Sequence, residues 1–436
     1  MTSRRRLTLS SVGLSLGIFL LVAPPASPAG FQVAAQGARA SGLGLAFVAL
    51  ANDPSAIYYN PAGLGWQKHF SGMVGGSLLT KVEGKFTGAN PFPGEGVEED
   101  QHKTTFVLPT VYGVVPLTSS VNFGIGVFAP YGLGFRWDDP EEFTGRFVAQ
   151  NAVIQSSDIN PVVSWQVTES FALAVGADYR SSKVTLERNR AAINPFTQSV
   201  VDVAHIKLDS ELLDNSGWGW NAGVLIKPVP LISIGLAYRS AIEIDYEGDA
   251  TFTQRPTGNA AFDALVASQL PQEDQDVQAT VEFPSTANVG LAVNLPGELT
   301  VSLQADWTEW SVFESLIVDF VNPTLPDLIR NTNWEDSWAY RAGVEKAWGA
   351  FALRGGYYFD ETPQPIEDVG PVIADADRNA YTIGFGYNTE RWGVDVSDIY
   401  IDFEERDTRG TDNADRYFGT YSEAANLFAI SFRVSF

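Results

Sequence analysis

Large apolar residues alternate with small or polar residues through much of this 436-residue chain. The segment 428–436 shows the pattern most plainly, because every second position is large and apolar, namely Phe428, Ile430, Phe432, Val434 and Phe436. A period of two predicts a β-strand with one apolar face. The same alternation recurs in runs that start near residues 121, 171, 232, 299, 351 and 381.

The longest run, 232–246, predicts a single strand with one apolar face from Ile232 to Tyr246. A soluble β-sandwich would also alternate, with its apolar face turned inward. Here the second face carries Gly, Ser, Arg and Asp, and aromatic residues gather near the ends of the apolar faces. These features favour a membrane barrel whose apolar faces meet lipid around a wet or filled lumen.

Short and long connections follow one another along the chain. Short turns lie at 117–120, 167–170, 227–230, 295–298, 347–349 and 388–391, and long loops near 87–103, 131–148, 185–215, 249–277, 318–334, 361–378 and 406–420. Six turns and seven loops require about 14 strands, and outer-membrane barrels have tight periplasmic turns and long outer loops. The sequence therefore predicts an all-β fold, a transmembrane antiparallel β-barrel.

Two local features are also expected. Trp392, Val394 and Val396 have the opposite parity to Ile399 and Ile401, which predicts a β-bulge at residues 397–398. The loops 185–215 and 249–277 are expected to form the landing site of a ligand, with a short amphipathic helix at 261–266.

The first 29 residues have the pattern of a secretory signal peptide. Arg4, Arg5 and Arg6 precede an apolar stretch, and the residues 27–29 offer a small-residue cleavage site. A transmembrane anchor is the other interpretation, but the stretch is shorter than the ~20 residues that a spanning helix needs. We therefore expect an exported protein with three parts: a signal peptide (1–29), a hatch (30–68) and a barrel (69–436).

Residues 30–68, called the hatch segment below, do not alternate. The segment is dense in Gly and Ala, so it cannot build a core of its own. Glycine permits close backbone approach, which suits a small plug packed inside a barrel lumen. A mobile periplasmic leader is the alternative, although it would expose Ile57, Tyr58 and Tyr59.

Composition excludes several classes of function. The formal net charge is −24, so nucleic acid is not an expected partner. The chain has no Cys and three His, which rules out thiolate metal sites and makes a metal or cofactor unexpected. Acidic loop residues are interpreted as solvated, with calcium bridging to lipopolysaccharide as the alternative.

Several motifs closely resemble the outer-membrane long-chain fatty acid transporter family (FadL/TodX, OMPP1). The residues that carry the resemblance are Gln36–Arg39, Asp53–Ser55, Asn60–Leu64, Val127–Leu133, Gly145–Arg146, Asn160–Pro161, Gly217–Gly223, Gly235–Ser240, Ala305–Ser311, Leu353–Tyr357 and Asp360–Pro363. The resemblance covers the mature chain and implies a fourteen-stranded barrel with an N-terminal hatch. It also implies uptake of hydrophobic molecules that leave sideways through the barrel wall. Members take long-chain fatty acids or aromatic hydrocarbons, and the motifs do not distinguish the two.

A fatty acid carboxylate calls for a cation, because charge-assisted hydrogen bonds are strong. Inward parity selects four ligand-binding candidates, Arg180, Arg239, Arg341 and Arg354, whose alternative role is to pair with lumenal acids. Arg239 or Arg354 is expected to contact the ligand head group or the hatch. Asn60, Pro61 and Ala62 are expected to anchor the hatch, since Asn satisfies backbone groups and Pro fixes φ.

Other functions remain as alternatives. An alkane or aromatic hydrocarbon channel of the same fold comes first, then a general porin, then an outer-membrane lipase. His69, His102 and His205 lie in no catalytic motif, so we expect no enzyme. The expected location is the bacterial outer membrane, and the expected partners are a hydrophobic small molecule, outer-membrane lipid and lipopolysaccharide. We also expect the barrel-assembly machinery to recognise the terminal Phe436, and the folded protein to be a monomer.

Overall fold

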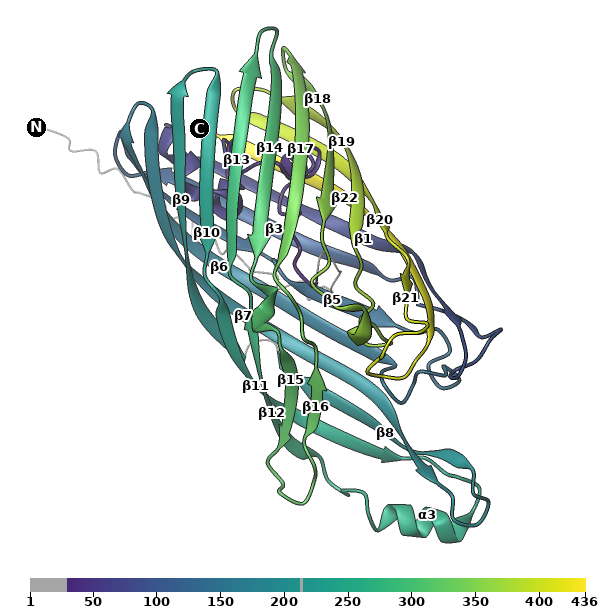
Figure 1. Ribbon diagram of the computed structural model, residues 1–436. Coiled ribbons are helices and arrows are strands. Elements are labelled where there is room, and N and C mark those ends of the chain that lie inside the picture. Colours follow the sequence, from purple (N-terminus) through teal and green to yellow (C-terminus); the bar gives the residue numbers. More distant parts are fainter. Residues whose placement is uncertain (1–29, 212–214) are drawn as a thin grey trace, which may run out of the picture.

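The computed structural model describes residues 30–211 and 215–436, so the predicted signal peptide lies outside the described residues. The chain forms a closed barrel of 14 antiparallel strands (Figure 1), as predicted. In chain order the wall strands are β1 (Ser71–Gly88), β3 (Thr105–Pro116), β4 (Val121–Phe128) continued by β5 (Gly132–Arg136), β6 (Asn151–Thr168), β7 (Phe171–Ile193), β9 (Ser216–Val229), β10 (Ile232–Arg239), β13 (Thr286–Leu295), β14 (Leu299–Thr308), β17 (Ser337–Trp348), β18 (Phe351–Asp360), β19 (Arg378–Asn388), β20 (Trp392–Phe403) and β22 (Gly419–Ser435).

Further strands extend the wall or lie in the long loops. They are β2 (Glu98–Asp100), β8 (Val200–Ser210), β11 (Ile242–Gln254), β12 (Gln275–Phe283), β15 (Ser315–Phe320), β16 (Leu328–Asn331) and β21 (Arg406–Asp407). The short helices are α1 (Ala38–Ser41), α2 (Ala56–Tyr59), α3 (Ala260–Ala267) and 3₁₀ turns at Pro61–Trp66, Trp310–Val312 and Ile366–Asp368. No helix within the described ranges is long and apolar enough to cross a membrane.

The first and last strands close the barrel. β1 pairs with β22 from Ser71↔Ser435 to Gly88↔Gly419. Closure joins the two ends of the sheet, which lipid requires because it cannot hydrogen-bond to the backbone. The short turns and the C-terminus lie at one end of the barrel, and the long loops lie at the other (Figure 1). The end with the short turns is therefore the periplasmic end.

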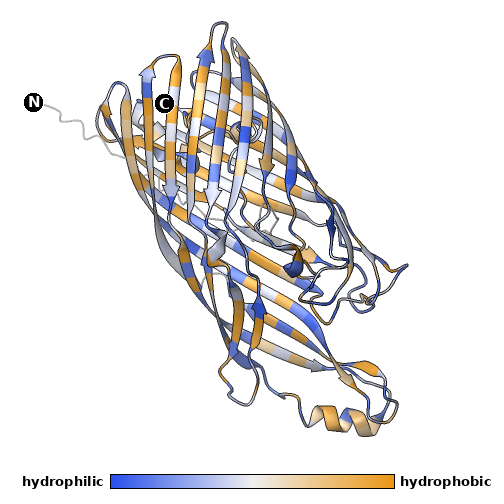
Figure 2. Ribbon diagram, in the orientation of Figure 1, coloured by the Kyte–Doolittle hydropathy of each residue, from blue (hydrophilic) through white to orange (hydrophobic). Residues whose placement is uncertain are grey.

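Hydrophobic and hydrophilic residues alternate along the wall strands (Figure 2). Phe428 and Ile430 are 43% and 48% exposed, whereas Ala429 and Ser431 between them are buried. Two aromatic bands flank the lipid-facing zone. The outer band includes Tyr179, Trp218, Trp220, Tyr238, Trp338, Tyr340, Tyr357, Tyr381 and Tyr400, and the periplasmic band includes Trp165, Trp348, Phe351, Trp392 and Phe436. Such bands mark the two membrane–water interfaces.

The single apolar face predicted for residues 232–246 is wrong. The chain forms two strands, β10 and β11, which are separated at residues 240–241. Ile234 and Leu236 point outward, but Ile242 and Ile244 are fully buried on the inner side while Glu243 is exposed. Beyond the outer aromatic band the outer face of β11 meets water instead of lipid. The apolar residues of β11 therefore lie on its inner face.

The predicted β-bulge at residues 397–398 is also wrong. β20 pairs without a register shift with both neighbours, through Ile383↔Asp398 and Asp398↔Phe428. Asp398 therefore keeps the outward parity of Trp392, and Ile399 turns inward to an apolar cluster. The change in polarity along this strand reflects the change in its surroundings rather than a slipped register.

The strands on one side of the barrel continue far past the membrane. β7, β8, β11 and β12 pair with one another beyond the outer band, and α3 caps their far end (Figure 1). The predicted helix at 261–266 is confirmed as α3. Asn259 caps it by accepting hydrogen bonds from the N–H groups of Ala261 and Phe262, and Phe262 and Val266 pack against β8.

The hatch segment lies against the inner face of the wall. Glycines on the wall make the close approach possible, because a Cβ on Gly343 would lie 2.3 Å from the Leu43 carbonyl oxygen and one on Gly235 would lie 2.2 Å from that of Val48. Real Cβ atoms do not approach so closely, so these positions accept only glycine. The wall therefore carries glycine where the backbone of the hatch segment packs against it.

Candidate ligand-binding site

An apolar cavity lies inside the extension beyond the outer aromatic band. Its volume is about 600 Å³. The turned-in apolar faces line it, including Ile154, Val184, Leu208, Tyr246, Val281 and Val318. Ligand sites for small molecules are typically concave, mostly apolar and of this size. The cavity is therefore the leading candidate site.

Phe31 of the hatch segment lies at one side of this cavity, within a cluster of aromatic rings. Its ring centroid lies 4.8 Å from that of Trp310 and 5.3 Å from that of Phe313. Tyr131, Phe283 and Trp334 complete the cluster at 5.8–6.0 Å. The start of the hatch segment thus borders the cavity directly.

The neighbouring backbone of Gly30 is fixed by a buried carboxylate. The Gly30 N–H donates to Asp375 Oδ2 at 3.1 Å, and Thr362 Oγ1 donates to the same oxygen. Asp375 also pairs with Arg378. Burial raises the pKa of the Asp375 carboxyl above its usual value, and Arg378 opposes that rise.

Two arginines line the cavity. The Arg330 guanidinium makes two hydrogen bonds to Asp415, with Nη1–Oδ1 3.0 Å and Nη2–Oδ2 2.9 Å. Arg188 has no ion pair or side-chain hydrogen bond within the described residues. It continues the face of β7 that carries Val184 and Leu186. Arg188 is therefore a cation in a mostly apolar lining, and within the described residues its N–H donors have no side-chain partner.

The barrel wall has a window beside the hatch segment. β4 pairs with β6 as far as Phe128↔Asp158, and β5 resumes at Gly132↔Gln155. β3 pairs with β4 only from Val111 onward, so within the described residues its outer half, 105–110, pairs with β1 alone. Hydrogen bonds near Gln101 and Trp137 close the outer end of the window.

The hatch segment supplies partners for the interrupted strand. The Val33 N–H donates to the Pro130 carbonyl oxygen at 2.7 Å, and the Gly132 N–H donates to that of Phe31 at 2.8 Å. Gln36 Nε2 donates to the Ala129 carbonyl oxygen at 2.7 Å. Buried backbone groups need such partners. The hatch segment therefore covers the window from the lumen side.

The predicted anchor motif makes three hydrogen bonds through the side chain of Asn60. Asn60 Nδ2 donates to the carbonyl oxygens of Val48 (2.9 Å) and Val224 (3.0 Å), and its Oδ1 accepts from the Ala62 N–H at 3.2 Å. Pro61 occupies the first turn of the 3₁₀ helix, where no N–H is needed. Val224 belongs to β9, so Asn60 ties the hatch segment to the wall.

Comparison with known proteins identifies the family. The model of the outer membrane protein transport protein family (OMPP1/FadL/TodX) matches residues 19–436. The chain belongs to this FadL/TodX family. The resemblance noted in the sequence is thereby confirmed, and so is an outer-membrane location.

Curated relatives match over nearly their whole length. A long-chain fatty acid transport protein of Escherichia coli is 23% identical, covering 95% of this chain and 96% of the relative. Outer membrane protein P1 of Haemophilus influenzae is 24% identical, covering 96% and 97%.

Solved structures share the fold. A Pseudomonas aeruginosa FadL homologue has a TM-score of 0.77 at 20% identity, covering 94% of this chain and 100% of that chain. The Pseudomonas putida toluene transporter TodX has a TM-score of 0.71 at 18% identity, covering 88% and 94%. At these identities the likeness shows the barrel architecture alone.

The four predicted ligand-binding arginines of this FadL/TodX-family chain are all buried in ion pairs. Arg180 pairs with Asp158 at 2.7 Å, and Arg239 pairs with Asp178. Arg341 pairs with Asp306 (2.5 Å) and Asp360 (3.2 Å), and Arg354 pairs with Glu345 (2.5 Å) and Asp395 (2.8 Å). None of the four lines the large cavity, and their role toward a ligand stays a prediction.

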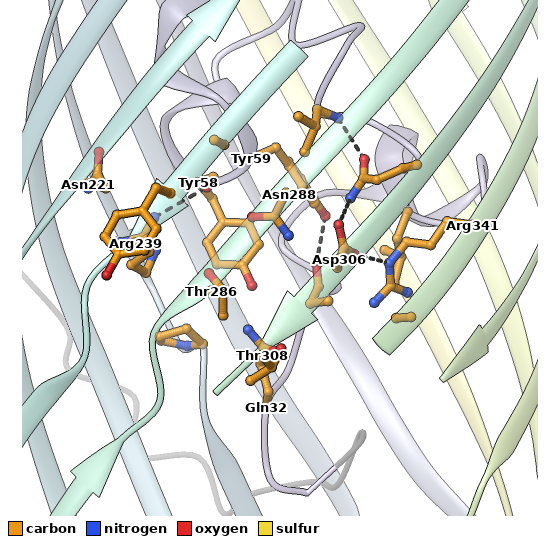
Figure 3. A pocket seen from close by; sticks show the side chains of 18 of the residues that line it. Gln32, Tyr58, Tyr59, Asn221, Arg239, Thr286, Asn288, Asp306, Thr308 and Arg341 are labelled. Atoms are coloured by element: carbon orange, nitrogen blue, oxygen red, sulfur yellow. Dashed lines mark hydrogen bonds and ion pairs between the residues drawn. The ribbon is translucent and has the colours of Figure 1, made fainter. Parts of the chain in front are cut away.

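Arg239 and Arg341 instead border a small polar cavity of about 60 Å³ in the lumen (Figure 3). They lie on opposite sides of Tyr58 and Asn288. Arg239 Nη2 donates to the Tyr58 carbonyl oxygen at 3.2 Å, so this arginine touches the hatch segment. The small cavity has room for a few water molecules rather than for an acyl chain.

Sequence reasoning missed three arginines. Arg39 of the hatch segment pairs twice with Glu345 on β17, at 3.0 and 2.9 Å. Arg188 and Arg330 line the cavity but fall in predicted loops. The signal for Arg188 was its parity, because it follows Val184 and Leu186 at two-residue intervals. Within the described residues, no group of three or more His, Asp or Glu side chains could hold a metal ion.

Proposed function

We propose that this outer-membrane transporter takes up hydrophobic molecules, most specifically long-chain fatty acids, by passive binding in the apolar cavity. The observation that carries the proposal is Arg188, a guanidinium without an ionic partner among the described residues, in the lining of a mostly apolar chamber of about 600 Å³. An acyl chain needs apolar walls, and a carboxylate needs a cation. The names of the curated relatives are consistent with this substrate.

Burial of the chain supplies the driving force. Each methylene removed from water contributes about 0.8 kcal/mol, so a long acyl chain gains far more than a short one. A carboxylate in an apolar chamber is costly unless it is paired and hydrogen-bonded. Arg188 offers that pairing with its five N–H donors. The hydrophobic effect therefore supplies the free energy of binding, and no other energy source is required.

We further propose that the ligand leaves sideways into the membrane through the window between β3 and β5. The interrupted pairing of this wall supports that route, because the backbone ladder is the barrier elsewhere. The lipid-facing side chains beside the window are aliphatic, including Val107 and Val111. Displacement of hatch residues 31–36 from Ala129–Gly132 would open the passage.

Arg239 and Arg354 keep a place in this proposal. Arg239 holds the Tyr58 carbonyl, and Arg354 shares Glu345 with Arg39 of the hatch segment. Both arginines therefore lie where the wall contacts the hatch segment, so movement of the hatch segment would alter their contacts. The exposed aromatic Phe436 at the chain end supports recognition by the barrel-assembly machinery, and barrel closure requires no second subunit.

Uptake of an aromatic hydrocarbon is the second candidate. The Phe31 cluster favours it, because three of its six rings, Phe31, Phe313 and Trp334, line the cavity and could stack on an aromatic solute. Such a solute carries no charge, so it would make no use of Arg188. Charge dependence therefore separates the two substrates.

The test compares Arg188→Gln with Arg190→Gln in cells that lack their own transporter. Arg190 lies two residues along the same strand, is exposed, and does not line the cavity, so it is the matched control. A charge-assisted hydrogen bond contributes roughly 1.5–3 kcal/mol, so Arg188→Gln should weaken fatty acid binding about tenfold or more. Heat-modifiable gel mobility checks that both variants fold.

The outcomes separate the candidates. Fatty acid uptake that falls for Arg188→Gln and not for Arg190→Gln establishes the proposal. Equal fatty acid uptake by the wild type and Arg188→Gln would overturn the role of this arginine. No fatty acid uptake by a folded wild-type barrel, together with uptake of toluene, would establish the hydrocarbon alternative.

A further inference from the structure

The hairpin β15–β16 stands apart from the barrel wall. It forms a small sheet of its own, with pairs from Ser315↔Asn331 to Val318↔Leu328. Only two residue pairs, Val277↔Phe320 and Gln278↔Asp319, join it to β12. Within the described residues, the other edge of β16 has no strand partner. Figure 1 shows the hairpin projecting past the ends of β14 and β17.

One face of this hairpin is a wall of the apolar cavity. Leu316, Val318 and Leu328 line the chamber from β15 and β16. Toward the tip, Val318 and Phe320 pack against Ile206, Leu208 and Val277. The inner face therefore lines the chamber through Leu316, Val318 and Leu328, and toward the tip it packs against β8 and β12.

Three attachments fix the hairpin. Its base is tied by the Thr332 N–H, which donates to the Glu314 carbonyl oxygen at 2.9 Å. Its tip is tied to β12 by the two residue pairs and by two further hydrogen bonds: the Val321 N–H donates to the Asp276 carbonyl oxygen at 3.1 Å, and Asn322 Nδ2 donates to Gln275 Oε1 at 2.7 Å. Its side is tied by the Arg330–Asp415 ion pair, which reaches the loop before β22.

The ion pair lies at the mouth of the cavity. Both Arg330 and Asp415 line the chamber, and so does Ile329, which is 66% exposed. The side chains of Arg330 and Asp415 are 23% and 13% accessible, so water reaches them. Within the described residues, this doubly hydrogen-bonded ion pair is the one side-chain link between β16 and the loop before β22.

We propose that β15–β16 is a flap which lifts at its tip and at the Arg330–Asp415 seam to admit the ligand into the cavity. The proposal rests on the function proposed above, in which this chamber holds a hydrophobic ligand. The base at Glu314 and Thr332 acts as the hinge. When the flap is raised, the apolar inner face of the hairpin meets the incoming acyl chain instead of water.

Disulfide trapping tests the flap, and the chain has no Cys to interfere. The variant Gln278→Cys/Asp319→Cys joins the tip of β15 to β12 at directly opposed, exposed positions. Opposed residues of antiparallel strands lie about 4.5–5.5 Å apart, which suits a disulfide. The measurement is the association rate of a fluorescent long-chain fatty acid with the purified barrel, oxidised and then reduced.

The matched control is Ser315→Cys/Asn331→Cys, which joins β15 to β16 within the hairpin and leaves its tip free. We expect oxidation to slow association at least fivefold for the tip variant and to leave the control unchanged, with reduction restoring the tip variant. Equal rates for the oxidised and reduced tip variant would overturn the flap. A wild-type barrel that binds no hydrophobic probe would overturn the proposed function itself, and the flap with it.

Discussion

At the scale of single residues, the lumen is organised by paired charges. Arg180, Arg239, Arg341 and Arg354 each meet a buried carboxylate on a neighbouring strand. Removal of one partner from such a pair costs about 3–5 kcal/mol, because the other charge stays buried without compensation. A single arginine variant at these sites therefore tests folding before it tests ligand binding, whereas Arg188 tests binding alone.

Asn60 ties the hatch segment to the barrel wall through its side chain. Asn60→Ala removes two hydrogen bonds to carbonyl oxygens and one from the Ala62 N–H. At about 1 kcal/mol each, the loss is roughly 3 kcal/mol. We expect the hatch segment to loosen and ion conductance in planar bilayers to rise severalfold. Asn294→Ala, which removes one exposed side-chain contact at the periplasmic end of β13, serves as the control. Unchanged conductance of Asn60→Ala would contradict the anchoring role.

At the scale of elements, the hatch segment forms backbone hydrogen bonds with the wall at the window between β3 and β5. Gln32 and Tyr131 form an isolated antiparallel bridge there. Opposed positions of this kind suit a disulfide. The variant Gln32→Cys/Tyr131→Cys should therefore lock the hatch segment against the window.

Oxidation of this variant should abolish uptake of a hydrophobic solute by cells, and a reductant should restore it. Comparing the two states of one variant removes the effect of losing the Tyr131 ring. Asn294→Cys/Thr300→Cys, which joins β13 to β14 far from the window, controls for oxidation itself. Equal uptake by both states of the locked variant would exclude the window as the route.

Sequence reasoning succeeded where the surroundings of a strand are uniform. The alternation of Phe428, Ile430 and Phe432 reports lipid on one side and lumen on the other, so the barrel followed from it, and the strand number followed from the succession of short turns and long loops. It failed at residues 240–246 and 397–398, where a strand passes from lipid into water. Alternation alone does not say which face of a strand is outside. Beyond the outer aromatic band the apolar face turns inward, and these inward faces line the cavity.

The candidate site was harder to predict than the fold for the same reason. Inward parity selected arginines within the membrane zone, where buried acids such as Asp158 and Asp178 neutralise them. Arg188 lies farther along β7, in a region predicted as loop. Its neighbours on the cavity come from β8, β12 and β16, and no local pattern reveals that these segments meet.

At the scale of the whole molecule, one chain faces three media: lipid, water and its own lumen. Leu303 on β14 is an outward residue between the two aromatic bands, and Glu243 on β11 is an outward residue beyond the outer band. Both are exposed in the isolated protein. Their surroundings differ only once the barrel is in a membrane.

The position of the membrane predicts opposite outcomes for the same substitution at these two sites. Leu303→Arg places a charge in lipid and should lower the free energy of unfolding from a bilayer by about 2–4 kcal/mol. Glu243→Arg leaves a charge in water and should change that free energy by about 0.5 kcal/mol or less. Denaturant titration of both variants in lipid vesicles, followed by heat-modifiable gel mobility, measures the difference. Equal destabilisation of the two would mean that the outer aromatic band does not mark the edge of the lipid, and that the extension around the cavity lies within the membrane.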